Sequence, residues 1–178
     1  MNTNQADPSK PVVAIVMGSA SDWPVLKEAV DVLRGFEVRF EAHVLSAHRT
    51  PTEAAEFARS AQERGFKVLI AAAGGAAHLA GVLAAHTTLP VLGVPLPGTP
   101  LNGLDALLST VQMPPGVPVA TLAIGQWGAI NAALLAVQIL ALENPVLQQR
   151  LLAHKESLRT KAREADSKLQ QEIASGRV

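Results

Sequence analysis

Residues 12–22 read VVAIVMGSASD, an unbroken apolar run that passes directly into small and polar residues. The run at residues 12–17 has the length of one strand and no polar position, which is typical of a strand buried on both faces of a sheet. Pro24 can open the helix that follows, and Gly35 can end it. A buried strand, a short loop and a helix in this order indicate an α/β protein with a parallel sheet.

Further strands are expected along the chain, each before a helix-like segment or a loop, with right-handed crossovers between them. Their apolar patterns place them at residues 36–44, 68–73, 91–94 and 117–124. A Pro- and Gly-rich connection at residues 95–103 is expected to lie over the carboxyl edge of the sheet.

The end of the chain is expected to be helical. Residues 128–142 are apolar nearly all round, yet fall short of the roughly 20 residues that a membrane span needs. A helix without a polar face is buried on all sides, so in a chain of this size the segment predicts a homo-oligomer and no membrane partner. Asn144 and Pro145 then begin an amphipathic C-terminal helix over about residues 145–173.

Length and composition limit the class of protein. The chain has 178 residues, which suits a single domain over residues 11–178 behind a disordered tail at residues 1–10. Lys and Arg total 15 and Asp and Glu total 15, so no basic excess suggests a nucleic-acid partner. The absence of cysteine excludes disulfides and thiolate chemistry. The first residues lack the apolar core of a signal peptide, so a cytoplasmic location is expected.

Polar side chains follow the first two strands, where the carboxyl ends of parallel strands meet. Ser19, Ser21 and Asp22 precede a helix, where free N–H groups favour a phosphate, although Ser and Asp are also ordinary helix caps. His48 offers an imidazole that titrates near neutral pH, and Arg49 can fork onto a phosphate or carboxylate. A capping His and a surface ion pair of the Arg are the alternative interpretation.

A third loop, GGAAHL at residues 74–79, comes after the expected strand at residues 68–73. Paired glycines allow the backbone to approach a ligand closely, and they equally allow a strand to turn sharply against a helix. His78, taken alone, fits a structural histidine as well as a site residue.

Taken together, six blocks in order and in register resemble one family, the PurE-type enzymes of purine biosynthesis, class I N5-carboxyaminoimidazole ribonucleotide mutases. The resemblance covers roughly residues 12–142. The blocks are MGSASDW at residues 17–23, SAHRTP at 46–51, GGAAHL at 74–79, GVP at 93–95, VQMP at 111–114 and NAALLA at 131–136.

The resemblance implies a flavodoxin-like three-layer αβα sandwich assembled as a homo-octamer, with a ribonucleotide substrate and neither a metal nor an organic cofactor. It implies an isomerase that moves a carboxylate from N5 to C4 of the imidazole ribonucleotide by decarboxylation and recarboxylation. His48 would be the general acid and base, while Ser19 and Arg49 suit the phosphate and Asp22 the ribose. The implied substrate-binding residues are Ser19, Ser21, Asp22, Ser46, Arg49, Gly74, Gly75, Ala76, Ala77, His78 and Leu79.

Some positions depart from the family pattern. Ala72, Ala80 and Val82 stand where the family usually has Gly, Pro and Met, and Gln126 replaces a Lys. Three other functions stay open at this point. They are a class II carboxylase that uses CO2 directly, a PurE-like carboxylase of nickel-pincer cofactor synthesis, and a non-enzymatic phosphate-binding scaffold of the same fold.

Overall fold

Within residues 10–176, which the computed structural model describes, five parallel strands form one sheet in the order β2-β1-β3-β4-β5. This order is the flavodoxin-like one, in which the chain reverses its direction across the sheet between β1 and β3. The prediction of a flavodoxin-like α/β fold is confirmed. The strands are β1 (Val13–Met17), β2 (Phe40–Val44), β3 (Val68–Gly74), β4 (Val91–Leu96) and β5 (Ala120–Thr121).

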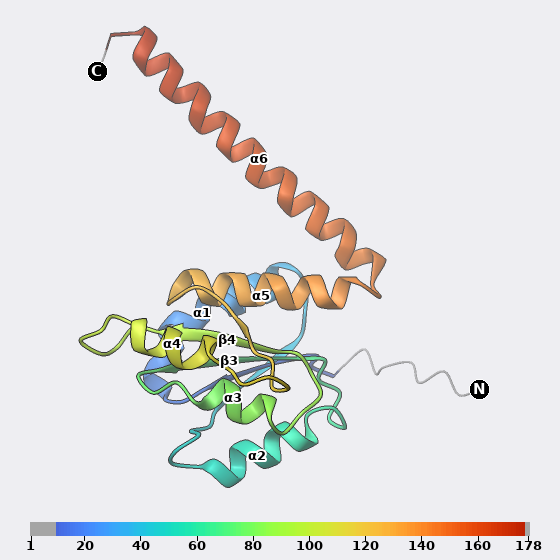
Figure 1. Cartoon of the computed structure of the whole chain (residues 1–178). Helices are drawn as coiled ribbons and strands as arrows, with labels where there is room; N and C mark the ends of the chain where they lie inside the picture. The colour runs from blue at the N-terminus through green and yellow to red at the C-terminus, as the bar shows by residue number, and fades with distance from the viewer. Residues whose placement is uncertain (1–9, 177–178) are drawn as a thin grey trace. The chain divides into compact units, whose positions relative to one another are not determined.

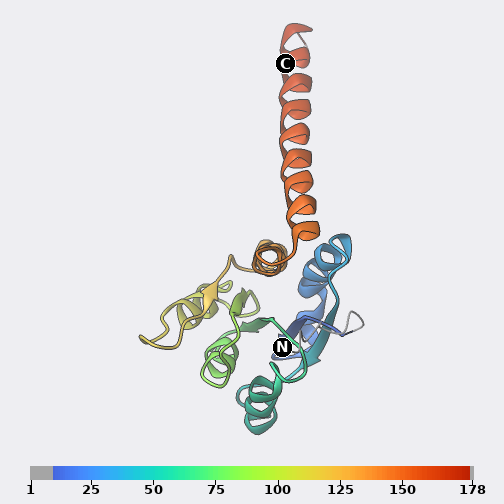
Figure 2. The same cartoon turned by 90° about the vertical axis from the view of Figure 1, so that its right-hand side faces the viewer.

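Helices cover both faces of this sheet and complete three layers. Two views of the chain show α1 and α5 on one face and α2 and α3 on the other (Figures 1 and 2). The face with α3 also carries α4, because a Cβ on Gly93 of β4 would meet Thr110 of α4 at 2.5 Å and Ala80 of α3 at 3.5 Å. The helical elements are η1 (Ala20–Asp22), α1 (Trp23–Gly35), α2 (Pro51–Ser60), α3 (Leu79–Ala84), α4 (Leu104–Val111), α5 (Gln126–Ala141) and α6 (Pro145–Ala174).

The chain divides into two units, one ending at Ile139 and the other beginning at Leu140. The second unit contains α6, the C-terminal helix that the sequence predicts. Asn144 caps it, since its side-chain oxygen accepts from the backbone N–H groups of Val146 and Leu147 at 3.1 and 3.2 Å. A single domain over residues 11–178 stays a prediction, and the predicted tail at 1–10 lies, except for Lys10, outside the described residues.

The core lies around β1, whose five residues are all buried, as predicted for a strand with both faces covered. The register pairs Met17 at the end of β1 with Val44 at the end of β2 and with Ala72 of β3. The loops that follow these strands therefore begin side by side at one edge of the sheet. This edge carries the residues that the sequence singles out.

Two strands are shorter than the sequence pattern predicts. The alternating pattern starts at Phe36, but this residue ends α1, and Glu37 turns the chain with a φ of 57° before β2 begins. The segment at residues 117–124 forms only a two-residue strand, paired with Leu92 and Gly93. Pro118 has no N–H to donate to a sheet ladder, which shortens this edge strand.

Among the residues that the structure describes, no helix is both long and apolar enough to cross a membrane.

Candidate functional site

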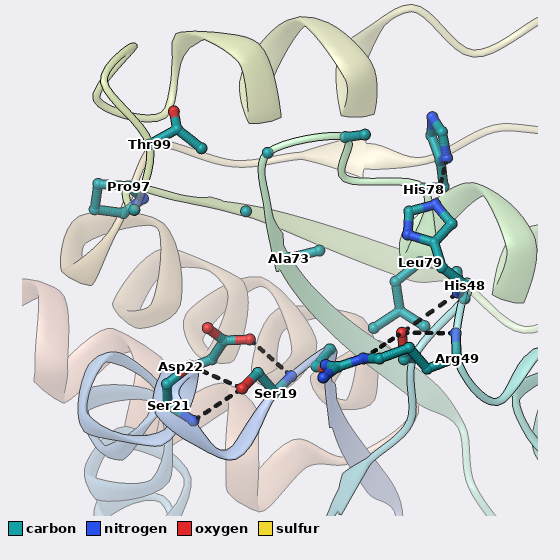
Figure 3. Close-up of a pocket in the computed structure, with 17 residues that line it drawn as sticks. Ser19, Ser21, Asp22, His48, Arg49, Ala73, His78, Leu79, Pro97 and Thr99 are labelled. Carbon is teal, nitrogen blue, oxygen red and sulfur yellow. Dashed lines mark hydrogen bonds between the residues drawn. The ribbon is translucent and has the colours of Figure 1, made fainter.

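A cavity of about 610 Å³ opens at the carboxyl edge of the sheet (Figure 3). The loops after β1, β2, β3 and β4 all contribute to its walls, so it lies where ligands bind in open α/β sheets. The lining residues are Gly18, Ser19, Ser21, Asp22, Ser46, Ala47, His48, Arg49, Ala73, Gly74, Gly75, Ala76, His78, Leu79, Pro97, Gly98 and Thr99.

The loop after β1 is held by a reciprocal capping arrangement. Ser19 Oγ accepts from the Ser21 N–H at 3.3 Å and from the Ser21 hydroxyl at 2.8 Å. The Ser19 N–H in turn donates to Asp22 Oδ2 at 3.0 Å. These bonds fix two hydroxyls and a carboxylate at one end of the cavity, next to the helical turn that begins at Ala20.

Burial raises the pKa of the Asp22 carboxyl above its ordinary value of 3.8. Two features oppose this effect, namely the hydrogen bond from the Ser19 N–H and the positive charge of Arg49. Because desolvation disfavours the charged form, the cavity holds an ionised Asp22 at some expense of stability.

This shift predicts a pH dependence of stability. Between pH 3.8 and the raised pKa, the folded protein binds more protons at Asp22 than the unfolded chain does. The contribution of Asp22 to the free energy of unfolding therefore falls as the pH rises through that window. We expect Asp22→Asn to gain stability relative to the wild type from about pH 3.8 upward, and the gain to level off above the raised pKa.

Urea unfolding of both proteins over a pH series measures this difference. Asp31→Asn, at an exposed position on α1, is the matched control and should show no such trend. A difference between Asp22→Asn and the wild type that stays flat with pH would contradict the role of burial.

The loop after β2 is organised by the Ser46 hydroxyl. Its oxygen accepts from the backbone N–H groups of His48 and Arg49 at 3.3 and 3.2 Å and from Arg49 Nε at 3.4 Å. Arg49 Nη2 reaches across to the first loop and donates to the Gly18 carbonyl at 2.7 Å. The guanidinium is therefore held over the cavity by a hydroxyl and a carbonyl, and the two loops are joined by one side chain.

His48 and His78 meet at the cavity wall. His48 Nε2 lies 2.7 Å from His78 Nδ1, and the two rings are nearly perpendicular at 84°. A hydrogen bond between two imidazoles needs one N–H and one lone pair, so the pair shares a single proton in this contact. The bond brings together residues of the second and third loops, and it makes His78 a site residue in geometry as well as in sequence.

The glycine loop after β3 forms the floor of the cavity. Gly75 has a φ of +61°, which favours glycine, and a Cβ on Gly74 would come within 3.3 Å of the Leu96 carbonyl oxygen. Gly74, Gly75, Ala76, His78 and Leu79 all line the cavity. Ala77 does not, since it is only 1% exposed and belongs to the buried interior.

The structure therefore brings together the predicted site residues, with Ala77 as the exception. The cavity is also lined by residues outside the predicted set, namely Gly18, Ala47, Ala73, Pro97, Gly98 and Thr99. The signal for the last three is the Pro- and Gly-rich connection after β4. Among residues 10–176, no group of three or more His, Cys, Asp and Glu side chains is placed to hold a metal ion.

Comparison with known proteins assigns the chain to a family. The model of the family described as AIR carboxylase matches residues 12–161. The chain belongs to the AIR carboxylase family. An N5-carboxyaminoimidazole ribonucleotide mutase of Pyrococcus abyssi is 58% identical over 149 residues, which are 84% of this chain and 84% of the relative. A Bacillus subtilis mutase of the same name is 52% identical over 160 residues, 90% of this chain and 99% of the relative.

Solved structures agree with this membership. The crystal structure of Treponema denticola PurE superimposes on this chain with a TM-score of 0.80 at 28% sequence identity. The superposition covers 90% of this chain and 99% of the Treponema chain. The similarity of this AIR carboxylase family member to PurE enzymes thus extends over the sheet and the helices that position the cavity.

The positions at which this chain departs from the usual family pattern do not line the cavity. Ala72 and Ala80 are buried behind it, in β3 and α3, and Gln126 is the exposed first residue of α5. These positions therefore contribute no side chain to the cavity wall.

Proposed function

We propose that this chain is an N5-carboxyaminoimidazole ribonucleotide mutase of purine biosynthesis, an isomerase that moves a carboxylate from N5 to C4 of the imidazole. One observation carries the proposal. A single cavity gathers the predicted His, Arg, Ser and Asp side chains in a chain that is more than half identical to enzymes named for this reaction. A class II carboxylase, a nickel-pincer carboxylase and a non-enzymatic scaffold are not favoured by these relatives.

The polar side chains of the cavity suit the phosphate and the ribose of a ribonucleotide. Arg49 and Ser19 would bind the phosphate, because a guanidinium and a hydroxyl supply the donors that phosphate oxygens accept. Asp22 would accept hydrogen bonds from the ribose hydroxyls. The backbone of residues 74–79 would lie along the base and its carboxylate, with N–H groups directed at the charge that develops there.

His48 would move the proton that each half of the reaction requires. The bond between N5 and the carboxylate carbon breaks, CO2 leaves, and N5 takes a proton from the His48 side chain. C4 of the substrate then attacks CO2 to form the new C–C bond. The His48 side chain removes the C4 proton, which restores the starting protonation state of His48.

The His48–His78 contact supports this role. An imidazole pair at 2.7 Å keeps its hydrogen bond whether it carries two ring protons or three. The pair can therefore release one proton and take one back while the hydrogen bond between the two rings stays in place. Through this bond His78 orients the ring of His48. We assign His78 this orienting role and substrate contact.

The proposal is tested with purified protein and two substrates. One reaction contains N5-carboxyaminoimidazole ribonucleotide, and the other contains aminoimidazole ribonucleotide with bicarbonate, both followed by ultraviolet absorbance of the 4-carboxylated product. Efficient conversion of the first alone at low CO2 is expected. Preference for the second would replace the mutase by a direct carboxylase, and no conversion of either would overturn an enzymatic function.

A homo-octamer in the cytoplasm is part of the same proposal. On α5, Ala129, Ala132 and Ala133 are fully buried, whereas Trp127 is 78% exposed, which suits a helix that a second copy covers. A ribonucleotide of a biosynthetic pathway is also expected in the cytoplasm. Sedimentation equilibrium measures the assembly, and a mass equal to one chain would contradict it.

A further inference from the structure

A short segment after β4 forms the wall of the cavity that the predicted site residues do not supply. Pro97, Gly98 and Thr99 line the cavity, and Pro97 and Thr99 lie across it from His48 and Arg49 (Figure 3). The segment continues to Gly103, and most of its residues are exposed. Because an exposed loop has few packing contacts to hold it, the position of this wall depends on its hydrogen bonds.

Within residues 10–176, the side-chain hydrogen bonds of this loop are made by the Thr99 hydroxyl. It donates to Asp105 Oδ2 at 2.7 Å and accepts from the Leu101 N–H at 3.2 Å. The Thr99 carbonyl also accepts from the Asn102 N–H at 3.0 Å. Over this described range, Thr99 is thus the one residue of the wall that a side chain outside the loop holds by a hydrogen bond.

Asp105 belongs to the first turn of α4, a helix seated closely on β4 at Gly93. Its second oxygen, Oδ1, is buried and has no hydrogen-bond partner in the described part of the chain. A buried carboxylate oxygen without a donor costs stability, so such a residue calls for a reason other than folding. Holding Thr99 is the contact that this carboxylate makes with the cavity.

This contact determines what Thr99 presents to a ligand. Its hydroxyl is engaged by Asp105 and Leu101, while its Cγ2 methyl lies 3.7 Å from the point where a Cβ on Gly75 would be. The methyl group and the glycine backbone therefore approach each other at the place where the proposed reaction holds its carboxylate. An apolar wall there can retain CO2, which offers little to a hydrogen-bonding group, and can exclude water.

We propose that Asp105 is a positioning residue, which holds Thr99 so that the wall of residues 97–99 stays closed against Gly75 and keeps CO2 in the cavity between the two halves of the reaction. The inference rests on the proposed mutase function. It adds Asp105 and Thr99 to the residues that determine the outcome of the reaction, although Asp105 itself does not line the cavity.

The test measures how the substrate partitions. With N5-carboxyaminoimidazole ribonucleotide as substrate, the amounts of 4-carboxylated product and of aminoimidazole ribonucleotide are determined, after subtraction of the loss without enzyme. Thr99→Val keeps the shape of the side chain but removes the donor, and Asp105→Ala removes the acceptor. We expect each to raise the share of substrate lost as aminoimidazole ribonucleotide and CO2 by about tenfold, the effect of losing a hydrogen bond to a charged group.

Two further variants make the result specific. The double variant should be no worse than either single one, because both changes remove the same contact. Ser109→Ala is the matched control, since it removes a hydrogen bond to the Asp105 backbone at 2.7 Å but leaves the carboxylate in place. Thermal unfolding confirms that each variant is folded.

Unchanged partitioning in folded Thr99→Val, or full additivity in the double variant, would each overturn this inference alone. A wild-type protein that forms no 4-carboxylated product would instead overturn the proposed function, and this inference with it.

Discussion

Replacing His48 with Asn is expected to lower kcat by about 100- to 10,000-fold, the range that a general acid and base contributes. Asn retains hydrogen-bonding groups of similar size but cannot accept and return a proton at neutral pH. The variant should bind the ribonucleotide nearly as well as the wild type, because Arg49 and Ser19 remain. Loss of turnover without loss of binding would therefore separate proton transfer from substrate recognition.

Steady-state kinetics gives kcat, and calorimetric titration with the product gives the affinity. His86→Asn is the matched control, because His86 lies outside the cavity and should leave both values unchanged. If His48→Asn turned over within a few-fold of the wild-type rate, another group would have to carry the proton, and the role proposed for the imidazole pair would fail.

Arg49→Ala is expected to have its main effect on binding, with a rise of about 10- to 100-fold in KM, the loss that charge-assisted hydrogen bonds to a phosphate account for. Arg49→Lys should lie between, since an ammonium keeps the charge but not the planar fork. The guanidinium also donates to the Gly18 carbonyl, so removing it breaks one contact between the first and second loops.

Titration of the variants with the ribonucleotide product measures this effect, and thermal unfolding reports any loss of loop structure. Arg39→Ala, remote from the cavity at a separate surface hollow, is the control and should bind like the wild type. An unchanged KM for Arg49→Ala would show that the guanidinium does not contact the phosphate.

The fold was largely predictable because its central strands are buried and therefore appear in the sequence as unbroken apolar runs. An unbroken apolar run such as residues 13–17 has one simple interpretation, and β1 is buried throughout. The edge strands were less predictable, because their length depends on neighbours that local sequence does not show. The alternation begins at Phe36, which caps α1, so its first residues precede β2, and Pro118 shortens β5.

The site was predictable loop by loop, since each loop follows a recognisable strand. The contacts between loops were not. His48 and His78 are 30 positions apart, and nothing in either segment indicates that their rings lie 2.7 Å from each other. Asp105 was missed for the same reason, because its importance comes from one bond to Thr99 and from an oxygen buried without a partner.

The cavity is assembled from four connections that span residues 18–99, one after each of the strands β1 to β4. During synthesis, the binding site is therefore incomplete until more than half of the chain has been made and β4 has joined the sheet. A bound ligand contacts several of these connections at once. Because it binds only the folded chain, it stabilises the whole sheet, so the supply of substrate is coupled to the lifetime of the folded enzyme.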